Sequence, residues 1–248
     1  MREDILKDAE KETRWLSIFR KVAMIGDSLS SGEFVALDEA GNYDYYDHFD
    51  YSWGQFMARK YGFTAYNFSR GGMTAKEYLN GFADRNHMFA PEYAAQAYFI
   101  ALGVNDFNTG IPLGAPEDET GADTFAGQIK GIVARYRNIQ PRAVFFFVTM
   151  PKTCRDSAEE REKKAAHRAL LYGIAEGMAH AYVVDLFAYA PEYDEAFERR
   201  HWMNGHMTPS GYLLTAEYIS RLTDALIDEH MEEFREVGFI GTDLWEKR

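Results

Sequence analysis

Four short polar blocks of the sequence carry side chains that can do chemistry. They contribute a hydroxyl at Ser28, a glycine at Gly72, a carboxamide at Asn105 and an imidazole at His206. A serine hydroxyl is a weak nucleophile at neutral pH, and a histidine, with an ordinary pKa of about 6.5, can take its proton. Backbone N–H groups and a side-chain amide can stabilise the negative charge that develops on a carbonyl oxygen. These residue types together suit acyl transfer through a serine nucleophile.

Each block alone is weak evidence. Gly-Asp-Ser-Leu is commonly a turn, paired glycines usually serve a tight backbone, and a single histidine usually lies on the surface or in the core. Asp27 and Asp106 are expected to cap or brace their loops rather than to catalyse. The joint role depends on whether the fold brings the four blocks together.

Five short apolar runs predict the strands that must position these blocks, at residues 22–25, 64–68, 98–102, 143–149 and 182–186. Helical patterns separate them, at residues 53–61, 74–82, 124–138, 158–180 and 209–230. Strands that alternate with helices form a parallel sheet with right-handed crossovers. The sequence therefore predicts an α/β fold, a three-layer α/β/α sandwich whose five-stranded sheet has the flavodoxin-like order 2-1-3-4-5. In such a sheet, ligands bind where the strands end.

The predicted domain covers residues 21–230, with an N-terminal helix over residues 1–20 and an extension over residues 231–248. The extension carries Phe234, Phe239 and Trp245, which we expect to pack on the domain or on a second copy of the chain. The extension is therefore a candidate element for a homodimer.

Composition limits the partners and the compartment. The chain has 248 residues and a formal net charge of −12, which disfavours nucleic acid and anionic membranes as partners. The single cysteine, Cys154, fits a reducing compartment. The first twenty residues lack the pattern of a signal peptide, and no apolar run is long enough to span a membrane. We therefore expect a cytoplasmic protein, with no metal and no cofactor.

The four blocks together resemble the signature of the SGNH, or GDSL, family of serine esterases and lipases. The resemblance runs from Val22 to about Ala216, and its motifs are G-D-S-L, G-G-M-T, G-V-N-D and H-M-T-P-S-G-Y. It implies that Ser28 is the nucleophile and His206 the base. It also implies an oxyanion hole formed by the backbone N–H groups of Ser28 and Gly72 and the amide of Asn105. The activity that it implies is carboxylic ester hydrolysis.

One residue of that signature is missing. The family usually has an aspartate three residues before the histidine, where this chain has Met203. A backbone carbonyl can hold the imidazole instead, in a serine–histidine dyad, or Asp185 at the end of the fifth strand can reach His206. The missing acid also leaves open a catalytically impaired protein that kept the fold to bind carbohydrate.

Two insertions bear on the substrate. Residues 33–52 alternate tyrosines with aspartates, and they form either a surface loop that packs its rings on the body or a rim where rings stack on sugar or acyl groups. Residues 108–123, rich in glycine and proline, predict an irregular loop on the same edge. The sequence contains no long apolar lid, so we expect a small-molecule or carbohydrate substrate, with short-chain or carbohydrate acyl esters hydrolysed.

Overall fold

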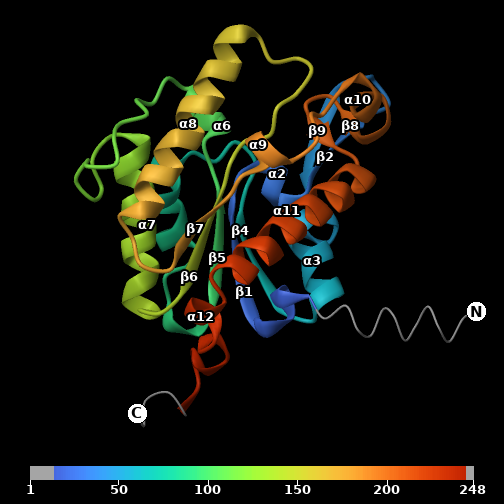
Figure 1. The fold of residues 1–248 in the computed structure, drawn as a ribbon. Coiled ribbons are helices and arrows are strands. Elements are labelled where there is room, and N and C mark those ends of the chain that lie inside the picture. Colours follow the sequence, from blue (N-terminus) through green and yellow to red (C-terminus); the bar gives the residue numbers. More distant parts are fainter. Residues whose placement is uncertain (1–13, 244–248) are drawn as a thin grey trace, which may run out of the picture.

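Five parallel strands form the central sheet of the computed structural model, which describes residues 14–243 (Figure 1). Their order, β4-β1-β5-β6-β7, is the predicted order 2-1-3-4-5, and the α/β fold is confirmed. Each strand begins and ends within two residues of its predicted bounds. The strands are β1 (Lys21–Gly26), β4 (Thr64–Ser69), β5 (Ala97–Ala101), β6 (Val144–Val148) and β7 (Ala181–Val184).

Helices cover both faces of this sheet, which explains why its central strands are apolar throughout. On one face, α3 (Trp53–Tyr61) and α11 (Pro209–Glu229) pack on a core that includes Phe146. On the other face, α7 (Phe125–Ile139) and α8 (Ala158–Glu176) pack on a second core that includes Phe145. Successive residues of β6 thus point to opposite faces, as the pleat of a strand requires.

Three predicted elements differ from the structure at their ends or inside. The helix predicted at 74–82 is broken into α4 (Ala75–Glu77) and a turn of π-helix, η3 (Tyr78–Phe82), with non-helical backbone at Asn80 and Gly81. The helix α8 ends at Glu176, four residues before its predicted end at residue 180. The last strand stops at Val184 because Asp185 caps the short helix α9 (Leu186–Tyr189).

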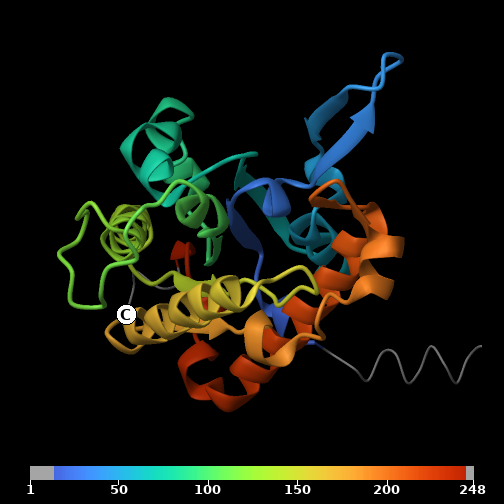
Figure 2. The same cartoon turned by 90° about the horizontal axis from the view of Figure 1, so that it is seen from above.

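The insertion at residues 33–52 contains a β-hairpin. Strand β2 (Glu33–Leu37) pairs in antiparallel fashion with β3 (Tyr43–Asp47), and the 3₁₀ turn η2 (Phe49–Tyr51) leads into α3. Seen from above, the hairpin projects away from the body (Figure 2).

The remaining short elements connect the larger ones. They are η1 (Trp15–Ile18), α2 (Ser28–Ser31), α5 (Ala83–Arg85), η4 (Pro91–Tyr93), α6 (Val104–Asn108), α10 (Glu195–His201), β8 (Trp202–Met203), β9 (His206–Met207), α12 (Met231–Phe234) and η5 (Val237–Phe239).

The two ends of the chain are described only in part. Most of the predicted N-terminal helix lies outside the described residues, and the described part forms the 3₁₀ turn η1. In the extension, Phe234 is buried and stacks on Phe146, with ring centroids 6.2 Å apart, while Trp245 lies outside the described residues. The described part of the extension therefore packs on its own domain, and the homodimer remains a prediction.

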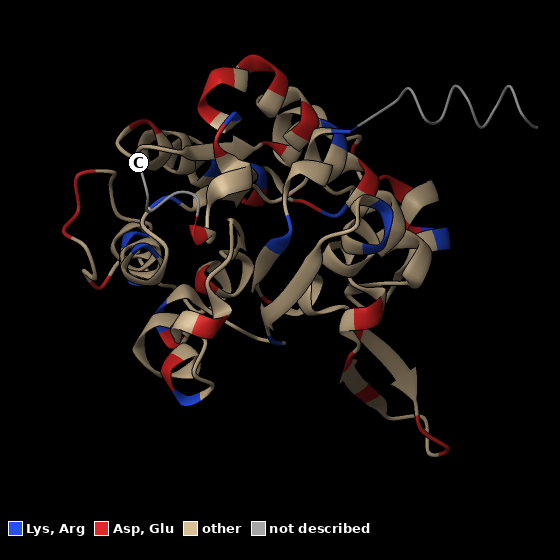
Figure 3. Cartoon of the chain, turned by 90° about the horizontal axis from the view of Figure 1, so that it is seen from below, with Lys and Arg blue, Asp and Glu red and all other residues tan. Residues whose placement is uncertain are grey.

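Acidic residues are distributed over many elements, including the hairpin (Figure 3). Within residues 14–243, no helix combines the length and the apolar character that crossing a bilayer requires.

Candidate active site

Ser28 begins a one-turn helix directly after β1. Asp27 caps this helix by accepting a hydrogen bond from the Leu29 N–H at 3.0 Å, and Gly32, with φ of 77°, ends it. Ser30 and Ser31 are buried under the turn. A Cβ at Gly26 would lie 2.3 Å from the Ser30 Oγ, so the turn packs closely on the end of the strand. The two buried serines thus let the turn pack closely on the end of the strand.

His206 directly follows a tight turn near the C-terminal end of the domain's sequence. Strands β8 and β9 are joined by Asn204 and Gly205, whose φ angles of 46° and 85° are typical of a type I′ hairpin turn. The helix α11 follows at once, capped by Thr208. Its Tyr212 hydroxyl donates to the backbone carbonyl of Glu33 at 2.8 Å and lies 3.3 Å from the carbonyl of Ser28. This tyrosine ties the helix behind His206 to the turn that carries Ser28.

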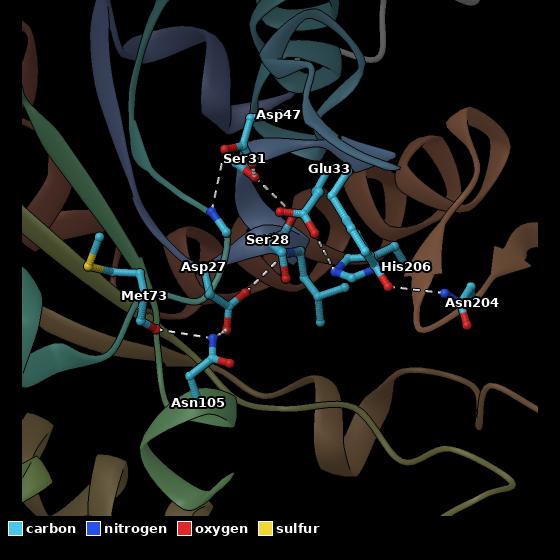
Figure 4. Close-up of polar contacts among 12 residues, drawn as sticks. Asp27, Ser28, Ser31, Glu33, Asp47, Met73, Asn105, Asn204 and His206 are labelled. Carbon is cyan, nitrogen blue, oxygen red and sulfur yellow. Dashed lines mark hydrogen bonds and ion pairs between the residues drawn. The ribbon is translucent and has the colours of Figure 1, made fainter. Parts of the chain in front are cut away.

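The imidazole of His206 faces a carboxylate that we did not single out in the sequence. Its Nε2 lies 2.9 Å from the Oε1 of Glu33 (Figure 4). The ring of Tyr45 stands edge-on to the imidazole, with a centroid distance of 5.6 Å. Burial lowers the pKa of His206, and the backbone of Asn204 and the charge of Asp47 partly offset this effect. The lowered pKa favours the neutral ring, the state in which it can accept a proton.

The nucleophile turn and the histidine hairpin are neighbours, because α2 packs against β9. Ser28 is half-buried, and no hydrogen bond joins its Oγ to His206 in the described part of the chain. Figure 4 shows Ser28, Glu33 and His206 grouped together.

The two candidate oxyanion donors approach from neighbouring loops. Gly72 follows β4 with φ of 72°, and a Cβ placed there would meet no atom within 4 Å, so this position borders open space. Asn105 lies in α6, directly after β5. Its Nδ2 donates to the carbonyl of Met73 at 3.2 Å and to the Oδ2 of Asp27 at 3.4 Å. The structure thus links the Asn105 amide to the loop of Gly72 and to the turn of Ser28.

Two buried carboxyl groups brace these loops. Burial raises the pKa of Asp27 to about 7, with the backbone N–H of Leu29 opposing the shift and the charges of Asp106 and Glu33 adding to it. Burial also raises the pKa of Asp106 to about 6. Asp106 accepts the backbone N–H of Ala75 at 3.0 Å and thereby holds the start of α4. Both aspartates have the bracing contacts expected of them.

Asp185 is not brought to His206. Its carboxylate is buried, accepts from Arg168 Nε at 2.5 Å and from the Tyr172 hydroxyl at 3.1 Å, and caps α9 through the N–H of Ala188. The reason is geometric: β7 ends before Asp185, and the residue turns toward α8. The hypothesis that Asp185 orients the imidazole is therefore corrected, and Met203, at the usual acid position, is exposed.

Known proteins share both the sequence pattern and the fold. Residues 24–214 match the model of the GDSL-like Lipase/Acylhydrolase family. A search of curated proteins finds no significant match. Among solved structures, the chain is similar to a protein described as lipolytic, of the G-D-S-L family, from Desulfitobacterium hafniense, with 20% identity, TM-score 0.57 and coverage of 82% of this chain and 98% of that one.

Two further structures support the fold. The psychrotrophic esterase EstA from Pseudoalteromonas is 14% identical, with TM-score 0.59 and coverage of 84% of this chain and 99% of that one. A family two carbohydrate esterase from Clostridium thermocellum, solved with cellohexaose, is 16% identical, with TM-score 0.58 and coverage of 86% of this chain and 65% of that one. With the family match spanning most of the sequence, the chain belongs to the GDSL-like lipase/acylhydrolase family.

Proposed function

We propose that this protein hydrolyses carboxylic esters with Ser28 as the nucleophile and His206 as the base. Membership of the family supports ester hydrolysis in general. The observation that carries the residue assignment is the junction of the Ser28 turn with the His206 hairpin, which α11 fastens through Tyr212. A largely buried imidazole with a lowered pKa, next to a partly exposed serine, is suited to accept the proton of that serine.

The reaction proceeds in two halves. The Ser28 Oγ bonds to the ester carbonyl carbon while its proton passes to His206, and the carbonyl oxygen becomes an oxyanion. The backbone N–H groups of Ser28 and Gly72 and the Asn105 amide donate to that oxygen. The leaving alcohol takes the proton from His206, and water then releases the acid by the same steps. Asn105 must turn its amide from its present acceptors toward the oxyanion.

The hairpin favours a carbohydrate as the alcohol part of the ester. In the register of β2 and β3, Val35 is opposite Tyr45 and Leu37 is opposite Tyr43, so these side chains share the face that Glu33 and Asp47 occupy at its base. Tyr45 contacts His206, and Tyr43 and Leu37 extend that face outward, 57% and 64% exposed. Flat rings of this kind stack on sugar rings, and the nearby carboxylates disfavour anionic substrates.

A small cavity favours a short acyl group. It measures about 60 Å³ and lies behind the turn, lined by Leu29 beside the nucleophile, by Met207 beside His206, and by apolar side chains of the core such as Trp53. A cavity of this size accepts only a small group. We therefore infer acetyl or similarly short acyl chains.

The direct test is labelling with a fluorophosphonate together with a panel of substrates. The wild-type protein is expected to take up the label, and Ser28→Ala and His206→Ala are expected to lose it. Ser30→Ala, two residues along the same turn, is the matched control and should keep the label. The panel comprises p-nitrophenyl esters of increasing chain length and acetylated cello- and xylo-oligosaccharides, with acetyl esters expected to react fastest.

The alternative is a catalytically impaired carbohydrate-binding protein. The absence of an acid at Met203 is the observation that favours it. It predicts no turnover of any ester, no label on Ser28, and binding of oligosaccharides that Ser28→Ala leaves unchanged.

A further inference from the structure

The carboxyl group of Glu33 occupies the nitrogen of His206 that the proposed reaction needs. Its Oε1 lies 2.9 Å from the His206 Nε2, while the other ring nitrogen, Nδ1, is buried without a well-formed hydrogen bond to any described residue. A carboxylate accepts the proton of an Nε2–H, and a carboxylic acid donates its own proton to the Nε2 lone pair. In either state Nε2 cannot accept the Ser28 proton until Glu33 moves away from it.

We propose that Glu33 is a specificity-determining residue, which favours esters whose alcohol part carries a hydroxyl group on the carbon next to the ester. Such a hydroxyl replaces the imidazole as the hydrogen-bond partner of the Glu33 carboxyl group and thereby frees Nε2. This inference rests on the proposed function, because it concerns the alcohol part of the ester that the same site hydrolyses.

Glu33 needs a replacement partner because its carboxyl group is enclosed. The side chain is only 11% exposed, and within the described residues its carboxyl group bonds to His206 alone. On the other side, a Cβ at Gly71 would collide with the Glu33 Oε2. A buried carboxyl group that loses its partner carries the full cost of its desolvation. A partner that arrives with the substrate removes this cost, whereas a substrate without a donor leaves it in place.

The alcohol part of the ester is the part that reaches Glu33. In the proposed reaction, His206 returns its proton to the departing alcohol, so the ester oxygen must approach Nε2. The Oε1 of Glu33 lies 2.9 Å from that nitrogen, and its Oε2 lies against Gly71, next to the proposed oxyanion donor Gly72. A hydroxyl on the carbon beside the ester oxygen therefore comes within hydrogen-bond reach of this carboxyl group.

The exchange of partners moves no proton out of the site. The proton shared between Glu33 and Nε2 stays on the carboxyl group, and the ring keeps its other proton on Nδ1, which leaves Nε2 free. Burial and the charge of Asp47 raise the pKa of Glu33, which favours this distribution. A hydroxyl group both donates and accepts, so it pairs with the carboxyl group in either protonation state. The Ser28 proton then passes to Nε2 and on to the departing alcohol.

The test compares ethylene glycol monoacetate with its methyl ether, in which the neighbouring hydroxyl is blocked. The wild-type protein is expected to prefer the free hydroxyl by about 10-fold in kcat/KM, the size of one hydrogen bond to a charged group. Glu33→Ala should raise kcat/KM for the methyl ether and reduce the preference to less than about twofold. Asp44→Ala, which removes an exposed acid of the same hairpin, is the matched control and should keep the wild-type preference.

NMR of the His206 ring in Ser28→Ala gives a readout without turnover. Ethylene glycol monoacetate should shift the Nε2 resonance and the methyl ether should not, a result that stands even if Glu33→Ala does not fold. Equal kcat/KM for the two esters in the wild-type protein overturns the proposal. So does a preference that survives in Glu33→Ala, a loss of activity on both esters in that folded variant, or the same Nε2 response to both esters.

Failure of this inference and failure of the proposed function give different results. If the wild-type protein hydrolyses neither ester and takes up no fluorophosphonate label, the proposed function fails. An active, labelled enzyme that shows no preference between the two esters defeats only the role of Glu33.

Discussion

At the scale of single residues, Asn105 combines structural contacts with a proposed role in the reaction. Its amide donates to the carbonyl of Met73 and to the buried carboxyl of Asp27, which keeps it between the Gly72 loop and the Ser28 turn. These contacts keep the donor next to the place where the oxyanion forms, and the amide leaves them only when it turns toward that charge. The same amide is therefore expected to act mainly in the transition state.

We expect Asn105→Ala to lower kcat about 10²- to 10³-fold with a small change in KM, because the lost donor acts on the oxyanion rather than on the bound ester. Steady-state kinetics on a p-nitrophenyl acetate series measures this. Asn108→Ala, at the exposed end of the same helix, serves as the control. A loss of less than threefold in Asn105→Ala removes this residue from the oxyanion hole.

At the scale of elements, the hairpin is the part of the site that the sequence conceals. The tyrosines and aspartates of residues 43–47 are all exposed, so the strand has no buried face to produce a clear apolar alternation. The contact between Glu33 and His206 depends on the pairing of β2 with β3 and on the Asn204–Gly205 turn. Neither spacing along the chain nor residue type predicts it, whereas the four motif blocks are visible because each directly follows or precedes a regular element.

Tyr43→Ala tests the hairpin as a subsite. It is expected to raise KM for an acetylated oligosaccharide about 2- to 10-fold through the loss of one stacking contact, and to leave kcat/KM for p-nitrophenyl acetate unchanged. The matched control is Tyr46→Ala, since Tyr46 points to the opposite face of the hairpin and is similarly exposed. Equal effects of the two variants, or an equal loss on both substrates, would contradict a sugar subsite on this face.

At the scale of the whole molecule, the architecture could be predicted because apolar runs and helical periods agree over most of the chain. The ends of elements could not be predicted in the same way, since local features at Asp185 and Gly81 end or bend them.

Burial also sets how the stability of the fold depends on pH. It raises the pKa of Asp27 to about 7 and lowers the pKa of His167 to about 4. The raised pKa of Asp27 makes the folded state less stable as pH rises toward 7, whereas the lowered pKa of His167 makes it less stable as pH falls below about 6.5.

His167 is fully buried, packs on the ring of Phe125, and neither of its ring nitrogens has a well-formed hydrogen bond. Because its pKa is lower in the folded state, the unfolded chain takes up the proton first as pH falls below about 6.5, and folding stability declines. His167→Leu removes this penalty. Relative to wild type, its free energy of unfolding should improve by ~1–2 kcal/mol between pH 7.5 and pH 5.

Urea denaturation of both proteins at pH 7.5 and pH 5 measures the change in their relative free energy of unfolding. Any packing effect of the substitution that does not depend on pH is the same at both values and cancels. His87→Asn is the control, because residue 87 is exposed and its positive φ tolerates asparagine. A His167→Leu difference that stays constant from pH 7.5 to pH 5 would show that the buried ring does not titrate in this range.

The hydrogen bond from Tyr212 to the turn of Ser28 spans 184 positions of the chain. A nascent chain whose α11 has not yet emerged from the ribosome already contains the proposed nucleophile, Ser28, and the proposed oxyanion donors, Gly72 and Asn105. It cannot yet complete the junction between the Ser28 turn and α11. Under the proposed function, activity therefore requires the docking of α11, the final long helix. Fragments split after α10 should regain turnover only when the two pieces are mixed.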